Sequence, residues 1–172
     1  MTELSTSALA AEVVHALIGH AATVAVAESL TGGLVCGALT SVPGASSVVR
    51  GAVVAYATEL KRDLLHVDAE LLRREGAVHP EVATSMAAGV RDRLGADVGI
   101  STTGVAGPEP QDGRPVGEVY VAVATRGAVR VESLNLDPTL GRSGIRAATV
   151  DAALMLLADV LTSDPHESAA TE

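Results

Sequence analysis

The sequence of 172 residues contains no phenylalanine, no tryptophan and only two tyrosines. A core without large aromatic side chains must be built from Ala, Val and Leu, which favours helices that approach a valine-rich sheet closely. The same scarcity leaves no aromatic platform on which the bases of a single-stranded nucleic acid would stack. The composition therefore points away from nucleic-acid binding.

Basic residues and long apolar runs are also in short supply. Twelve Lys and Arg residues face 21 Asp and Glu residues, so the formal net charge is -9 and a broad positive surface for nucleic acid or anionic membrane is missing. No apolar run approaches the length of a membrane span, and the N-terminus lacks the charge and apolar pattern of a secretion signal. We expect a soluble, cytoplasmic protein that binds neither nucleic acid nor membrane.

Cysteine occurs once, as Cys36. A single cysteine excludes an internal disulfide and a cysteine-rich metal site, and a free cysteine is most often a small buried hydrophobic residue. No set of His, Cys and Asp residues shows metal-ligand spacing. The sequence therefore predicts no metal and no cofactor.

The stretch Thr23–Gly33, TVAVAESLTGG, is the one around which the rest is organised. Its alternating small and β-branched residues are typical of a buried parallel strand, which would end by presenting Ser29 at the sheet edge. Gly32 and Gly33 leave backbone amides uncovered where a helix over 34–40 would begin, so the turn offers an oxyanion pocket beside a hydroxyl. The alternative is ordinary N-cap and turn chemistry, since neither a GxSxG nor a phosphate-loop motif is present.

A second strand and helix follow the same plan. Val48–Tyr56 is apolar and β-branched, and Thr58 is predicted to be the N-cap of the next helix. Lys61 would then occupy N3, where a capping box has Glu or Gln and where the positive end of the helix disfavours a cation. Such a violation is expected at functional sites, and the helix dipole would lower the pKa of a lysine toward use as a base. The alternative is a surface lysine that points into solvent.

The remaining pattern predicts one domain over residues 1–163 and a polar, disordered tail over 164–172. Strands alternating with helices, followed by a hairpin, favour a three-layer α/β/α sandwich with a mixed, mainly parallel sheet. The other expected helices are Ser5–Ile18, Asp68–Glu75, one beginning at Pro80 and one over about Thr139–Thr162; the other expected strands are Asp97–Thr103, Val116–Ala124 and Ala128–Leu136.

Polar groups follow three of the predicted strands: Ser29, then Tyr56 with Lys61, then Thr102 or Thr103. In open α/β sheets ligands collect outside the carboxyl ends of the strands, so these groups are expected to converge. A loop rich in Gly, Pro and polar residues runs from 104 to 115, and its length favours a functional role.

These residues also resemble the CinA C-terminal family, whose enzymes are nicotinamide-nucleotide amidases. The resemblance covers about residues 5–160. It implies a cytoplasmic α/β/α fold, commonly dimeric, that hydrolyses nicotinamide mononucleotide to nicotinate mononucleotide and ammonia, in the form that stands alone without an N-terminal molybdopterin-binding-like domain. The matching motifs are Ala27–Gly33 (AESLTGG), Val54–Tyr56 with Lys61, Gly76–Val78, and Thr103–Pro108 (TGVAGP) with Pro115–Gly117.

The resemblance also implies roles for individual residues. Ser29 would be the nucleophile, Lys61 its base, Tyr56 a partner in the hydrogen-bond network and Thr103 a residue of the substrate pocket. A lysine base requires no histidine if desolvation and a helix N-terminus lower its pKa. From their chemistry, we expect the backbone amides near Thr31, Gly32 and Gly33 to hold the oxyanion, and either the turn from Gly104 to Gly107 or Arg142 and Arg146 to bind the phosphate.

A second hypothesis is a non-catalytic module that keeps a nucleotide pocket but serves regulation or a partner protein. The presence of Ser29, Tyr56 and Lys61 together favours the enzyme, because a pure binding protein has no need of a nucleophile and a displaced lysine in one pocket. The expected partners are therefore a nucleotide substrate and a second copy of the chain.

Overall fold

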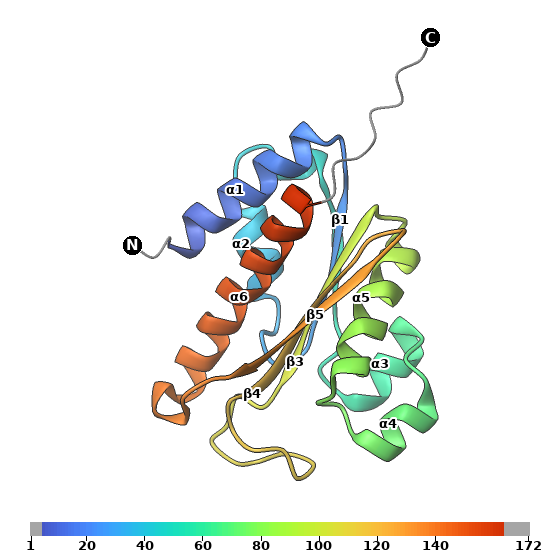
Figure 1. Ribbon diagram of the computed structural model, residues 1–172, viewed down its shortest axis with the longest axis vertical. Helices are drawn as coiled ribbons and strands as arrows, with labels where there is room; N and C mark the ends of the chain where they lie inside the picture. Colours follow the sequence, from blue (N-terminus) through green and yellow to red (C-terminus); the bar gives the residue numbers. More distant parts are fainter. Residues whose placement is uncertain (1–4, 164–172) are drawn as a thin grey trace.

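The computed structural model describes residues 5–163, so the predicted tail over 164–172 lies outside the described residues. Within them, five strands form one sheet in the order β2-β1-β3-β4-β5. The sheet is the middle layer of three, with helices on both faces (Figure 1). The strands are β1 Val24–Glu28, β2 Val49–Val54, β3 Val98–Gly104, β4 Glu118–Ala124 and β5 Val129–Asn135.

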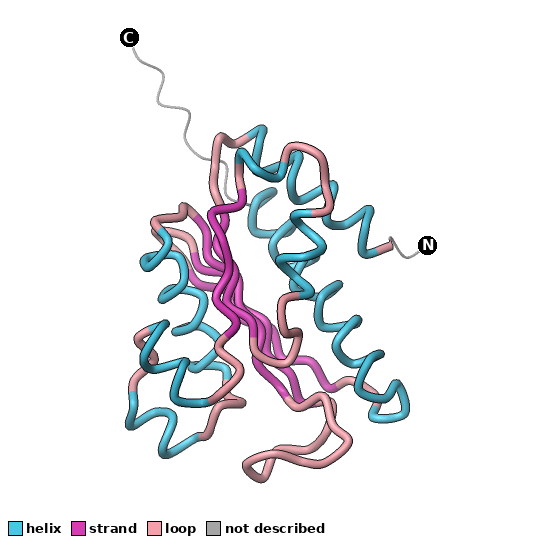
Figure 2. Tube along the Cα trace, turned by 180° about the vertical axis from the view of Figure 1, so that it is seen from behind, coloured by secondary structure: helices cyan, strands magenta, loops and turns pink. Residues whose placement is uncertain are grey.

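Two groups of helices cover the two faces of the sheet, which Figure 2 shows from behind as a narrow band between them. One group is α1 Thr6–Gly19, α2 Leu34–Thr40 and α6 Gly141–Ser163; the other is α3 Thr58–Leu65, α4 Ala69–Glu75 and α5 Pro80–Leu94, with short 3-10 turns at Ala45–Ser47 and Pro138–Leu140. Among residues 5–163, no helix is both long enough and apolar enough to cross a membrane.

The sheet is mixed, as the sequence predicts. β1 pairs in parallel with β2 and with β3, whereas β3, β4 and β5 are antiparallel neighbours. Glu28, the last residue of β1, lies opposite Val54 of β2 and Thr102 of β3. The carboxyl ends of these three strands therefore meet at one edge, which brings together the segments that carry the predicted site.

Small side chains let α5 lie very close to the sheet. Ala83 and Ala87 of α5 pack against Ala122 and Ala124 of β4. A Cβ added at Gly99 of β3 would stand 1.9 Å from the carbonyl oxygen of Ala87. The expectation of closely packed helices on a valine-rich sheet is confirmed.

The start of α3 differs from the prediction. Its N-cap is Ala57, which has no side chain able to cap the helix, and Thr58 is the first helical residue. Lys61 is consequently the fourth helical residue rather than the third. Ala57 was not recognisable as the N-cap from the sequence, because threonine is a more common N-cap residue than alanine and Thr58 follows it directly.

The position of α3 depends on a glycine in α5. A Cβ added at Gly89 would stand 2.0 Å from the carbonyl oxygen of Leu65, the last residue of α3. Backbone atoms cannot move aside as a flexible side chain can, so any larger residue must push the two helices apart.

We expect Gly89→Ala to lower the free energy of unfolding by about 1–3 kcal/mol, because overpacked helices must separate. The matched control is Gly37→Ala in α2, where no heavy atom lies within 4 Å of the added Cβ. That change should be neutral or stabilising by up to about 1 kcal/mol, since alanine is the better helix former. Urea unfolding of both variants measures the difference, and equal effects would contradict the close contact.

Candidate active site

Ser29 is the first residue after β1, and its backbone amide donates a hydrogen bond of 3.1 Å to the carbonyl oxygen of Thr102. The sheet thereby fixes the backbone that carries the hydroxyl. Ser29 retains 8% of its surface and faces a pocket of about 120 Å³. The pocket is lined by Ser29, Leu30, Tyr56, Ala77, Val78, Thr103, Gly104, Val105, Ala106, Gly107, Glu109, Gln111 and Arg142.

Lys61 reaches this serine from α3. Its Nζ donates hydrogen bonds to Ser29 Oγ at 3.1 Å and to the carbonyl oxygen of Ala55 at 2.7 Å, and the lysine has no exposed surface. The burial of Lys61 therefore excludes the alternative of a surface lysine that points into solvent. Serine and lysine are in the contact that proton transfer between them requires.

Burial lowers the pKa of Lys61 from 10.5 to about 8, because the charged ammonium loses its hydration. The negative charges of Glu59 and Asp112 act in the opposite direction and raise the pKa. Of the two causes expected from the sequence, desolvation and the helix dipole, desolvation is the largest contribution in the structure. With such a pKa, about a tenth of the lysine is neutral at pH 7.

Glu28 organises the turn that carries Ser29, a role that the sequence pattern did not reveal. Its carboxylate has no exposed surface and accepts hydrogen bonds from three backbone amides at the start of α2: Gly33 at 2.9 Å, Val35 at 3.1 Å and Cys36 at 2.9 Å. A carboxylate at a helix N-terminus accepts hydrogen bonds from the unpaired amides, and its negative charge interacts favourably with the positive end of the helix dipole. The anion pocket predicted at this turn is thus filled by the protein's own carboxylate.

The oxyanion donors predicted in this turn must be reassigned. The Gly33 amide is bonded to Glu28, and the Gly32 amide donates to the carbonyl oxygen of Ser29 at 3.1 Å. Within the described part of the chain, the amides of Leu30 and Thr31 make no hydrogen bond. Of these two residues only Leu30 lines the pocket, so its amide is the best placed to hold an oxyanion.

Thr31 points into the protein instead. Its side chain is fully buried, and its hydroxyl shares a hydrogen bond of 2.7 Å with that of Thr102 in β3. Together with Gly32 and Gly33, it lies outside the pocket lining. These three residues shape the turn that carries Ser29, but they do not line the space beside it.

Tyr56 and Arg142 form the rim of the pocket. Arg142, in the first turn of α6, donates from Nη2 to Tyr56 Oη at 2.7 Å and from Nη1 to the carbonyl oxygen of Gly107 at 2.6 Å. Tyr56 is 58% exposed. Its hydroxyl is therefore bonded to an arginine rather than to Ser29 or Lys61, and it joins the site through the rim.

Arg146 lies one turn further along α6 and has a different task. It donates from Nε to the carbonyl oxygen of Leu30 at 2.9 Å and from Nη2 to that of Thr31 at 3.0 Å. Its guanidinium therefore braces the turn behind Ser29 and lies outside the pocket lining. Of the two arginines predicted at the phosphate, the structure brings only Arg142 to the pocket.

The third strand supplies the opposite wall. Thr103 lines the pocket, and its hydroxyl donates to the carbonyl oxygen of Ala77 at 2.7 Å. Gly104 and Gly107 also line it, as expected. The wall residues that sequence reasoning missed are Ala77, Val78, Glu109 and Gln111, although Ala77 and Val78 belong to a motif that it had singled out.

A larger cavity of about 580 Å³ lies beside this pocket. It is lined by Thr58, Leu72, Arg73, Arg74, Glu75, Gly76, Asp112 and Arg114. Its arginines are ion-paired: Arg73 with Glu70, Arg74 with Glu75, and Arg114 with both Glu75 and Glu118. Within residues 5–163, no cluster of three or more His, Cys, Asp or Glu residues is placed to hold a metal ion.

The chain is similar to known proteins over most of its length. A CinA-like protein of Frankia casuarinae is 48% identical over 155 residues, which cover 90% of this chain and 35% of that protein. The chain thus spans about a third of the length of the first curated relatives that it matches.

Solved structures match over nearly their whole length. The competence/damage inducible protein CihA of Agrobacterium tumefaciens is 36% identical with a TM-score of 0.86, covering 94% of this chain and 99% of that one. A CinA superfamily protein of Klebsiella pneumoniae is 31% identical with a TM-score of 0.89, covering 94% and 100%. The family model for the CinA C-terminal domain matches residues 6–161. The chain therefore belongs to the CinA C-terminal domain family.

Proposed function

We propose that this protein hydrolyses nicotinamide mononucleotide to nicotinate mononucleotide and ammonia, with Ser29 as nucleophile and Lys61 as general base. The observation that carries the proposal is the 3.1 Å contact between Ser29 Oγ and a fully buried Lys61 whose pKa is lowered to about 8. The choice of substrate rests on the resemblance of the motifs to nicotinamide-nucleotide amidases.

The reaction begins when neutral Lys61 takes the proton of Ser29 as Oγ attacks the carboxamide carbon. The negative oxygen of the tetrahedral intermediate accepts a hydrogen bond from the amide of Leu30. Lys61 then returns the proton to the leaving nitrogen, so ammonia departs and an ester on Ser29 remains. Lys61 then takes a proton from a water molecule that attacks the ester, and passes it to Ser29 Oγ as that oxygen leaves, which releases the nicotinate product and restores the serine hydroxyl and the neutral lysine.

The pocket accommodates only part of such a substrate. Sites for whole small molecules typically occupy about 300–1,000 Å³, whereas this pocket measures about 120 Å³. The ring with its carboxamide would occupy the pocket, and the ribose and phosphate would lie at the rim. Arg142 is the cation at that rim, and its contacts with Tyr56 and Gly107 hold the guanidinium in place.

The central prediction is that Ser29→Ala and Lys61→Ala each remove most of the ammonia release from nicotinamide mononucleotide. The double variant should be little slower than either single variant, because residues acting as one unit are not additive. Lys61→Arg should not restore turnover, since a guanidinium stays protonated.

Two outcomes would contradict this prediction. A Lys61→Ala enzyme with near-normal turnover but weaker substrate binding would make Lys61 a binding residue. A wild-type protein that binds nicotinamide mononucleotide without any turnover would favour the regulatory module.

The rate should rise with pH through the pKa of Lys61, because only the neutral amine accepts a proton. Asp112 raises that pKa, so Asp112→Asn should move the midpoint of the pH–rate profile to lower pH. Asp63→Asn is the matched control, since Asp63 is an exposed residue of α3 paired with Arg62. Equal shifts in the two variants, or none in either, would argue against Lys61 as the titrating base.

The buried lysine should also reduce stability. Its pKa falls from 10.5 to about 8 on folding, so between these values the unfolded chain binds more protons and stability rises with pH. Below pH 8 the lysine is protonated in both states, so the whole cost of burying the ammonium reduces the free energy of unfolding. We expect Lys61→Met to raise the free energy of unfolding at pH 7 by about 2 kcal/mol, after allowance for the lost hydrogen bond to Ala55.

This gain should shrink as the pH approaches 10, where the lysine of the unfolded chain also begins to lose its proton. Urea unfolding at pH 7 and pH 10 measures both values. A variant that is less stable than the wild type at pH 7 would show that the ammonium is not penalised by burial.

A further inference from the structure

Two chain segments form the pocket walls away from Ser29. One is 76–78, which joins α4 to α5 and contributes Ala77 and Val78. The other is the loop 109–114, which contributes Glu109 and Gln111. The same two segments also bound the larger cavity, through Gly76 on one side and Asp112 and Arg114 on the other. Their separation therefore sets the shape of both spaces.

The loop 109–114 has a defined tip. The backbones of Gln111 and Arg114 exchange hydrogen bonds of 3.1 Å and 2.8 Å across Asp112 and Gly113, which both have positive φ. This is the geometry of a tight two-residue hairpin, for which Asp-Gly is a favoured sequence. Asp112 lies against Gly76, where an added Cβ would stand 3.2 Å from that of Asp112. The tip thus touches the opposite wall directly.

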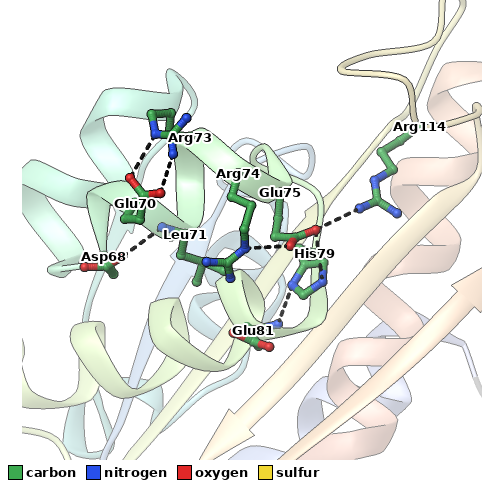
Figure 3. A network of polar contacts seen from close by, with 9 residues as sticks. All are labelled: Asp68, Glu70, Leu71, Arg73, Arg74, Glu75, His79, Glu81 and Arg114. Carbon is green, nitrogen blue, oxygen red and sulfur yellow. Dashed lines mark hydrogen bonds and ion pairs between the residues drawn. The ribbon is translucent and has the colours of Figure 1, made fainter.

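Glu75, the last residue of α4, lies beside both His79, which follows the segment 76–78, and Arg114 of the loop (Figure 3). Its Oε1 accepts a hydrogen bond of 2.9 Å from Arg74 Nε, and its Oε2 lies 3.7 Å from His79 Nε2 and 3.9 Å from Arg114 Nη2. The hydrogen bond from Arg74 and the nearby charges hold the pKa of Glu75 below its ordinary value. The carboxylate is thus charged at neutral pH.

The partners of Glu75 lie at the ends of both segments. His79 follows 76–78 directly and is the N-cap of α5, where its Nδ1 accepts a hydrogen bond from the amide of Glu81. Arg114 closes the hairpin tip, and its other nitrogen is 3.2 Å from Glu118 at the start of β4. Glu75 and Glu118 hold the guanidinium of Arg114 from two sides.

We propose that Glu75 is a positioning residue for substrate binding, which holds the loop 109–114 against the segment 76–78 through Arg114 and His79. It touches no reacting atom, and the effect on substrate rests on the proposed function. The side chains of Glu75 and Arg114 are each 30% exposed, so this ion pair alone contributes little to stability. The effect arises because one carboxylate of α4 contacts both His79 at the start of α5 and Arg114 of the loop. The role concerns mainly affinity, because Ser29 and Lys61 are held by β1 and α3. Since Asp112 at the hairpin tip also raises the pKa of Lys61, kcat is compared well above pH 8, where the lysine is neutral in both proteins.

The test compares Glu75→Gln with Glu70→Gln. Both residues lie in α4 and each pairs with an arginine, but the partner of Glu70 is the exposed Arg73. In Glu75→Gln, the amide hydrogens of Gln111 and Arg114 should exchange about two- to five-fold faster, because the hairpin tip opens more often. The KM for nicotinamide mononucleotide should rise by a similar factor with kcat within about two-fold. Glu70→Gln should change none of these.

Two further results complete the test. Glu75→Asp, which keeps the charge, should restore part of the protection, and Glu75→Gln combined with Arg114→Ala should be little worse than either change alone. Unchanged exchange in Glu75→Gln, equal effects in Glu70→Gln, or a fall in kcat without a rise in KM would each overturn the proposal. Hydrogen exchange requires no turnover, so a wild type that releases no ammonia would refute the proposed function while the role of Glu75 in holding the loop is still measured.

Discussion

Burial of the Lys61 ammonium is the constraint on which the site depends. A lysine with no exposed surface costs stability, and its hydrogen bonds to Ser29 and to the carbonyl oxygen of Ala55 reduce that cost without removing it. The compensation comes from the apolar cluster that α3, α4 and α5 build on the sheet, including Leu65, Val82 and Met86. The packing of α3, α4 and α5 on the sheet therefore stabilises the fold enough to keep Lys61 buried.

The turn that carries Ser29 is held by hydrogen bonds from two sides. Glu28 binds the amides at the start of α2, and Arg146 binds the carbonyl oxygens of Leu30 and Thr31 from α6. A turn whose donors and acceptors are bonded to charged side chains has little freedom, so Ser29 keeps one position relative to Lys61. Among the described residues of this turn after Ser29, Leu30 is the one that lines the pocket, and its amide makes no hydrogen bond, which leaves that amide for the proposed oxyanion.

Much of this protein follows from sequence alone, because many of its signals act over a few residues. Asp68 caps α4 and Gly76 ends it; Ser5 caps α1; Pro80 opens α5, and residues 125–128 turn the hairpin between β4 and β5. The alternation of strand and helix was sufficient to predict a mixed sheet with helices on both faces, and parallel pairing then required Ser29, Lys61 and Thr103 to meet at one edge.

What the tertiary structure decided is how side chains of similar type came to differ in role. Arg142 and Arg146 are one helical turn apart and indistinguishable in the sequence, yet the packing of α6 directs one to the pocket rim and the other to the backbone behind Ser29. The lowered pKa of Lys61 likewise arises mainly from burial among distant segments, whose extent the sequence pattern around Lys61 does not specify. Solvent exposure and long-range contacts depend on the whole packed chain, whereas caps, turns and periodicity depend on neighbours, and the sequence determines only the latter by itself.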